Sequence, residues 1–435
     1  MIKHVRWLAK EVEEWCAEGI VTREQAVAIK GRYPVVEPAH AWGRVVFFSL
    51  GAILFGLGVI LLFAYNWDGL HKFVKLGIVF SALLAAHGSG FWLCRSQGNN
   101  RPVGEGLHVL GTVLFGAGIW LVAQIYHINE HYPNGIFFWS LGALAMAWAL
   151  PSTPQGVAAS FLLALWGGLE VFGFRQMNHL APIFIIVGLL PLAWRQRSRV
   201  FLGAGVAAML VTVAFNCGRL DDDLLIPVFI FLANGLIGVS ILAGRTSFPE
   251  SRRILSFFGS LIYIIVLYSL TYKGVIRHID YRLDTSAAIL YMSLSGFLAI
   301  SSWIMVFFLS AVRKTEDIRQ ILRPEHFGQI ITMLLVLGLG FGDYRGGWGW
   351  GGATMFNLLF LFHSVMLIIH GCREVSLKQT TFGCLLFSIL AISRYVDLFG
   401  SLIARSMVFF IVGGGIFATG FFYTQSKKQG LEDKR

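Results

Sequence analysis

Long runs of hydrophobic residues, separated by short polar loops, cover most of this 435-residue chain. A helix that crosses about 30 Å of hydrocarbon needs about 20 apolar residues, with a lower limit near 17. By this criterion the pattern predicts an all-α, polytopic membrane bundle of about 14 helices, within a range of about 12 to about 15. The predicted spans cover residues 45–65, 75–94, 107–126, 135–150, 156–174, 181–194, 200–216, 224–243, 254–271, 287–311, 328–342, 353–370, 380–393 and 404–423. Four of them, near 135, 181, 328 and 380, are short enough to be re-entrant or broken helices.

The first 43 residues have a different pattern, with charged residues between apolar ones. Four apolar positions recur at helical spacing: Val5, Leu8, Val12 and Trp15. Gly19 stands where a left-handed residue ends a helix. Thr22 and Gln25 then form a capping-box pattern, which opens a second helix through Arg32. The pattern predicts a small cytoplasmic α-hairpin.

Three segments follow from this division of the chain. Residues 1–43 form the predicted hairpin, residues 44–424 form a multi-pass transmembrane domain, and residues 425–435 form a charged cytoplasmic tail. The first long apolar run begins well inside the chain, so we expect the first membrane helix to act as an uncleaved insertion signal.

One internal repeat is visible in the transmembrane domain. The sequence LGAILFGLGVIL at 50–61 matches LGTVLFGAGIWL at 110–121 in seven of twelve positions. The match is typical of a duplicated two-helix unit, at 45–94 and 107–150, but low-complexity apolar sequence also produces such matches by chance. Glycines at these spacings allow membrane helices to approach closely.

Composition excludes several classes of protein. Hydrophobic residues make up 56% of the chain and charged residues 14%, against about a quarter charged in soluble proteins. The net charge of +11 comes from Lys and Arg in short loops, where they set membrane orientation rather than bind nucleic acid. Their distribution predicts that both termini lie in the cytoplasm. The scattered cysteines form neither a zinc pattern nor a disulfide framework: Cys16, Cys94, Cys217, Cys372 and Cys384.

Several stretches resemble an uncharacterised bacterial membrane-protein family known as domain of unknown function 2157. The likeness lies in WLAKEVEEWCAEGIVTREQAVAIKGRY at 7–33, YNWDGLHKFVKL at 65–76, AQIYHI at 123–128 and SRYVDLFGSLIARSMVFFIVGGG at 393–415. The resemblance implies a bacterial inner-membrane protein with a cytoplasmic α-hairpin. It brings no activity, substrate or catalytic residue.

The richest group of polar residues lies at the outer end of the third span: Gln124, His127, Glu130 and His131. If the helix continued, His127 and His131 would share one face and could chelate a metal, but the spacing is not that of a zinc-binding HExxH motif. We therefore predict no metal site. The group is interpreted as the lining of a polar pocket or pathway, or as an interfacial belt.

Other polar residues within or beside spans are candidates because such residues usually face protein or water. Asn66 and Asp68 follow the first span and could form an external binding surface or cap a loop. Glu170, near the end of the fifth span, needs a cation, water or a proton, or else reaches the interface. Arg394 and Asp397 are three residues apart and can pair on one helix face.

The segment FGDYRGGWGWGG at 341–352 contains six glycines, which predicts a flexible connector or an external lid rather than a helix. It is not a nucleotide-binding loop, because no strand precedes it.

No Walker loop, nucleophile elbow or established catalytic spacing occurs, and we assign no catalytic residue and no cofactor. The leading hypothesis is a membrane protein that moves or binds a small molecule, lipid or glycolipid without ATP hydrolysis. The alternative is a membrane scaffold or sensor whose residues 1–43 dock a cytoplasmic protein partner. An enzyme is the less favoured class.

Overall fold

The computed structural model describes residues 2–32, 71–95, 100–128, 131–220, 222–277, 285–311, 322–341, 348–397 and 402–432, with scattered positions between 46 and 61. Within these ranges the chain is helical and contains no strand. It forms two compact units, Met1–Ala158 and Ala159–Arg435. The predicted all-α helical bundle is confirmed.

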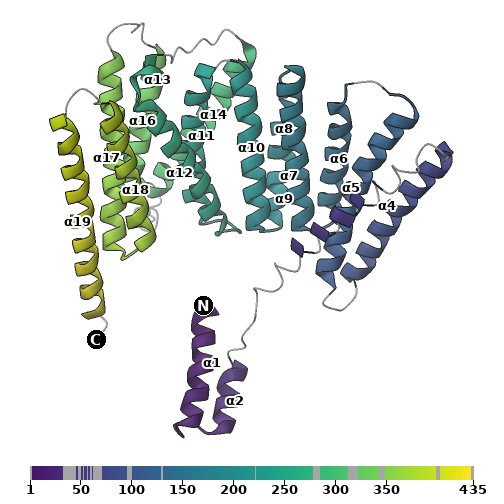
Figure 1. Cartoon of the computed structure of the whole chain (residues 1–435), viewed down its shortest axis with the longest axis horizontal. Coiled ribbons are helices and arrows are strands. Elements are labelled where there is room, and N and C mark those ends of the chain that lie inside the picture. Colours follow the sequence, from purple (N-terminus) through teal and green to yellow (C-terminus); the bar gives the residue numbers. More distant parts are fainter. Residues whose placement is uncertain are drawn as a thin grey trace. The chain divides into compact units, whose positions relative to one another are not determined.

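The first unit contains two short helices followed by longer apolar ones (Figure 1). Its helices are α1 (Ile2–Ala17), α2 (Arg23–Arg32), α4 (Lys72–Arg95), α5 (Arg101–Ile125), α6 (Pro133–Ala149) and the first part of α7 (Thr153–Gly168).

Helices α1 and α2 form a hairpin whose turn follows the predicted chemistry. Gly19 has a φ of +76°, the left-handed conformation that glycine adopts without strain. The Thr22 N–H donates to Oε1 of Gln25 (3.0 Å), and the Gln25 N–H donates to Oγ1 of Thr22 (3.3 Å). The capping box is therefore present, and α2 ends at Arg32 as the sequence indicated.

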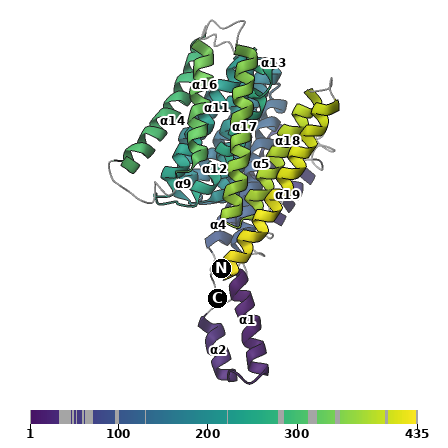
Figure 2. The ribbon, with the colours of Figure 1, turned by 90° about the vertical axis from the view of Figure 1, so that its left-hand side faces the viewer.

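The second unit begins within α7 and holds the remaining helices. They are η1 (Leu169–Gly173), α8 (Leu180–Phe184), η2 (Ile185–Leu189), α9 (Leu190–Arg195), α10 (Arg199–Leu220), α11 (Asp222–Ala243), α12 (Ser251–Leu270), α13 (Lys273–Arg277), α14 (Ser286–Ala311), α16 (Pro324–Phe341), α17 (Trp348–Arg373), α18 (Leu377–Asp397) and α19 (Leu402–Glu432). Helix α17 packs against α12, α16 and α18 (Figure 2).

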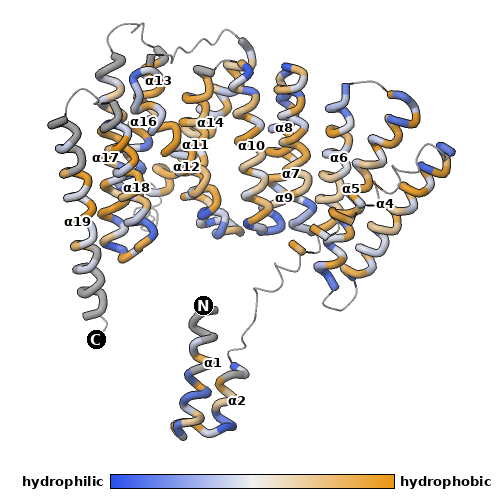
Figure 3. Tube along the Cα trace, viewed as in Figure 1, coloured by the Kyte–Doolittle hydropathy of each residue, from blue (hydrophilic) through white to orange (hydrophobic). Residues whose placement is uncertain are grey.

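Eight helices in the described part of the chain are long and apolar enough to cross a membrane. They are Lys72–Arg95, Arg101–Ile125, Thr153–Gly173, Arg199–Leu220, Leu224–Ala243, Ser251–Leu270, Ser286–Ala311 and Gly351–Arg373. Shorter apolar helices cover Leu180–Arg195, Pro324–Leu339 and Phe410–Phe422. Apolar residues follow the helices and hydrophilic residues gather towards their ends (Figure 3). A multi-pass membrane protein is thus confirmed, whereas the number of about 14 spans stays a prediction.

Two irregular segments test the sequence predictions further. The short span expected at 181–194 contains a π-helical segment, η2, between α8 and α9. The prediction that 341–352 is not helical is wrong for residues 348–352, since α17 begins at Trp348. A Cβ at Gly352 would lie 3.4 Å from Ile276 of α13. Packing of this kind offsets the weak helix propensity of glycine.

Candidate functional site

The predicted polar group at residues 124–131 lies where α5 ends. The Tyr126 N–H donates to the carbonyl of Val122 (3.0 Å), and His127 adopts a left-handed φ of 51°. The helix stops at Ile125, and α6 begins at Pro133 and packs against α5. The helix does not continue through His127 to His131, so the condition for a shared helical face is not met.

A cavity of about 420 Å³ lies between α4, α5 and α6 beside this turn. Its walls are mainly aromatic and aliphatic, and include Phe80, Phe115, Trp120 and Phe138. Three polar residues also line it: His131, Tyr132 and Asn134. Among the predicted residues that the structure describes, His131 lines this cavity, while Gln124 and His127 are exposed at the turn. The arrangement presents hydrogen-bonding groups at one part of an otherwise apolar hollow.

A row of buried and half-buried polar groups crosses the same helices. The indole N–H of Trp139 donates to the Thr112 carbonyl (2.7 Å), and the Gln155 amide donates to the Thr112 hydroxyl. Thr112 in turn donates to the carbonyl of His108 (3.2 Å), and the Nδ1 atoms of His108 and His87 lie 3.2 Å apart. These contacts join α4, α5, α6 and the start of α7.

Sequence reasoning missed the two histidines, although both stand inside predicted spans, where an ionisable residue is itself a signal. One Nδ1 must donate to the other, so the pair shares a single proton between its rings. The Nε2 atom of His108 is buried and has no hydrogen-bond partner among the described residues. Two imidazoles need further ligands to hold a metal, and no group of three His, Cys, Asp or Glu residues suited to one occurs in the described ranges.

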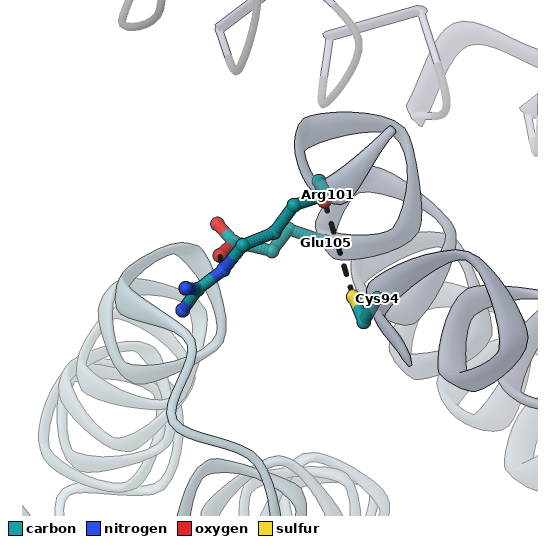
Figure 4. Close-up of polar contacts among 3 residues, drawn as sticks. All are labelled: Cys94, Arg101 and Glu105. Atoms are coloured by element: carbon teal, nitrogen blue, oxygen red, sulfur yellow. Dashed lines mark hydrogen bonds and ion pairs between the residues drawn. The ribbon is translucent and has the colours of Figure 1, made fainter. Parts of the chain in front are cut away.

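Close contacts hold α4 against α5 at the opposite end of the pair. Figure 4 shows Cys94 of α4 directed at the carbonyl of Arg101 (3.9 Å), and Arg101 bonded to Glu105 one turn along α5 (3.1 Å). A Cβ at Gly104 would lie 2.6 Å from Sγ of Cys94 and 2.8 Å from the Gly90 carbonyl oxygen. The helices touch here through their backbones.

The sequence repeat has different surroundings in its two copies. In the second copy, a Cβ at Gly111 would lie 2.4 Å from His87, and one at Gly116 would lie 2.3 Å from Trp139. In the first copy, no described atom lies within 4 Å of a Cβ at Gly51 or Gly58. Close glycine packing is thus present in the second copy, and duplication stays a hypothesis.

None of the other described candidates is among the residues that line this cavity. Asn66, Asp68 and Glu130 lie outside the described residues. Glu170 is buried in η1, where it accepts a hydrogen bond from the Trp166 indole (3.2 Å).

Arg394 of α18 contacts the residues that follow α12. Its guanidinium donates to the Thr271 carbonyl (3.3 Å) and lies 4.6 Å from the centre of the Tyr272 ring. The predicted pairing involves the side chain of Asp397, which lies outside the described side chains.

The fold and its apolar helices define a multi-pass helical membrane protein. Residues 13–156 match the model of the family described as predicted membrane protein (DUF2157). The match confirms the resemblance for the hairpin region and for α4 to α6, and it does not reach residues 393–415. No curated protein and no solved structure matches the chain significantly.

Proposed function

We propose that this is a bacterial inner-membrane protein, with both termini in the cytoplasm, that binds a lipid, glycolipid or similarly amphipathic small molecule and moves or presents it without ATP hydrolysis. The observation that carries the proposal is the cavity between α4, α5 and α6. Its volume of about 420 Å³ falls within the usual range of ligand pockets, about 300–1,000 Å³. The concentration of Lys and Arg on one side of the predicted spans supports an orientation with both termini in the cytoplasm.

The lining favours an amphipathic ligand over a polar solute. Aromatic and aliphatic walls accept an acyl chain, while His131, Tyr132 and Asn134 supply hydrogen-bonding groups for a headgroup. Because surrounding lipid tails are as apolar as the walls, burying a chain here gains little from the hydrophobic effect. We therefore expect selectivity to come from the polar side chains, and affinity to come from packing.

Filling the cavity tests this proposal. Gly135 lines it, and a Cβ at this position would lie 3.6 Å or more from its neighbours, so a larger side chain can grow into the space. We expect Gly135→Phe, in nanodiscs that contain a lipid with a photoactivatable acyl chain, to reduce crosslinking to α5 and α6 by about tenfold or more. A loss of about 1.4 kcal/mol in binding is sufficient for this effect. Mass spectrometry of the crosslinked peptides provides the measurement.

The matched control is Gly88→Phe on α4, where no described atom lies within 4 Å of an added Cβ. This variant should crosslink like the wild type. His131→Phe should keep acyl crosslinking but remove the preference among headgroups. Uniform crosslinking over all helices, or unchanged labelling in Gly135→Phe, would contradict the proposal.

A second function, that of a scaffold or sensor, is favoured by the surface of the hairpin. Trp7, Ile20 and Val27 are exposed on α1, its turn and α2, and exposed apolar side chains of this kind can contact a cytoplasmic protein partner. Deleting residues 1–40 should abolish a scaffold's activity and leave lipid crosslinking in the cavity unchanged. Loss of crosslinking without loss of partner binding would count against this second function.

A further inference from the structure

Three helices of the second unit, α12, α16 and α17, enclose a polar group that the proposed lipid site does not use. It consists of Tyr263, Thr332 and His363, one side chain from each helix. All three are buried within apolar helices. A polar group in such surroundings must find partners inside the protein, and it usually has a function.

The imidazole of His363 faces acceptors on both sides. Its Nδ1 lies 2.7 Å from the Leu359 carbonyl, and its Nε2 lies 3.1 Å from the Glu325 carbonyl. The hydroxyl of Tyr263 lies 3.2 Å from the same Nε2. Gly328 makes this approach to α16 feasible, because a Cβ there would lie 2.6 Å from the His363 ring.

The Tyr263 hydroxyl has two acceptors for its one proton. Besides Nε2 of His363, it lies 2.8 Å from Oγ1 of Thr332. Thr332 donates its own hydroxyl proton to the Gly328 carbonyl (2.8 Å), so its oxygen can accept the proton of Tyr263.

These contacts give each N–H and O–H donor of the three side chains an acceptor, both when His363 is neutral and when it is protonated. In the neutral ring, Nδ1–H donates to Leu359 and Nε2 accepts from Tyr263. When one proton binds to Nε2, the new N–H donates to the Glu325 carbonyl, and the Tyr263 hydroxyl turns to Thr332. Every donated proton has an acceptor in either state, so the change requires rotation of a single hydroxyl.

Charged and titratable groups surround the site. Glu325 of α16 interacts electrostatically with His363 and can balance its charge. His326 of α16 interacts with His363, with Arg252 of α12 and with Arg323 before α16. One turn apart on α16, Oε2 of Glu325 and Oε1 of Gln329 are buried and accept no hydrogen bond from the described residues. The surroundings therefore offer unpaired acceptors close to a ring that can become cationic.

We propose that His363 is a proton-binding site of the membrane-spanning helices, and that the Tyr263 hydroxyl changes its partner when the proton binds. This goes beyond the lipid-binding proposal and does not depend on it. The site gives α12, α16 and α17 a means of responding to a proton gradient.

The test follows the ¹⁵N signals of histidine side chains in full-length protein in nanodiscs, from about pH 4 to about pH 9. His363→Gln identifies the signal. Tyr263→Phe removes a donor that only the neutral ring uses, so we expect the titration midpoint of His363 to rise by about one pH unit. Thr332→Val removes the acceptor that Tyr263 needs in the protonated state, so the midpoint should fall by a similar amount. Tyr268→Phe, also on α12, is the matched control and should leave the midpoint unchanged.

Shifts of opposite sign would support the proposal, because general loosening of the helices cannot produce them. A His363 signal that never titrates, or equal shifts in Tyr263→Phe and Thr332→Val, would overturn it. A signal that responds to Na⁺ but not to pH would also overturn it and would assign the unpaired oxygens of Glu325 and Gln329 to a cation.

Discussion

Replacing Asn216 with leucine is expected to lower the free energy of unfolding by about 3 kcal/mol. The Asn216 side chain is fully buried in α10 and holds the turn between η1 and α8. Its Oδ1 accepts from the Asn178 N–H (2.8 Å), and its Nδ2 donates to the Asn178 carbonyl (2.9 Å). With leucine at position 216, the N–H and the carbonyl of Asn178 stay buried without these partners, at a cost of about 1–3 kcal/mol each. Unfolding in mixed detergent micelles, followed by tryptophan fluorescence, measures the change.

Asn234 on α11 provides the matched control. It is equally buried, but its amide donates only to the Ile230 carbonyl of its own helix (2.9 Å), and its Oδ1 has no partner in the described part of the chain. Asn234→Leu should be neutral or stabilising, because it removes an unpaired acceptor. If Asn216→Leu and Asn234→Leu lowered the free energy of unfolding equally, burial of the amide, and not the bridge to Asn178, would determine the loss of stability.

Gly104→Val is expected to have the other large effect, a loss of about 3 kcal/mol in the free energy of unfolding, at the upper end of the usual range for overpacking. The added carbon would lie 2.8 Å from the Gly90 carbonyl oxygen, which cannot rotate away as a side chain can. Helices α4 and α5 must therefore separate. The same unfolding measurement applies, and crosslinking between cysteines placed on α4 and α5 would report the separation.

Gly88→Val on α4 is the control, since no described atom lies within 4 Å of a Cβ at that position. Cys94→Ala combined with Gly104→Ala should recover only part of the stability lost in Gly104→Ala, because the contact with Gly90 remains. Full recovery would mean that the thiol of Cys94, and not the backbone, limits the approach of the two helices.

Local features near the N-terminus could be predicted because short-range chemistry determines them. The left-handed Gly19 and the reciprocal bonds of Thr22 and Gln25 depend only on residues within a few positions of each other. Local reasoning left open whether His127 and His131 share a helical face, and the structure decides this because α5 ends at Ile125. Glycine content failed to locate the start of α17 at Trp348, because helix propensity is a weak local preference that tertiary context can override.

The sequence by itself determined that this is a multi-pass helical membrane protein with an N-terminal hairpin, since hydrophobic length and capping patterns are read along the chain. Only the tertiary structure decided which polar residues meet: His87 with His108, and Tyr263 with Thr332 and His363. In a soluble helix the apolar stripe marks the packed face. A membrane helix is apolar towards lipid as well as towards its neighbours, so periodicity does not indicate which face packs. The partner of a buried polar side chain is therefore fixed by how the helices pack.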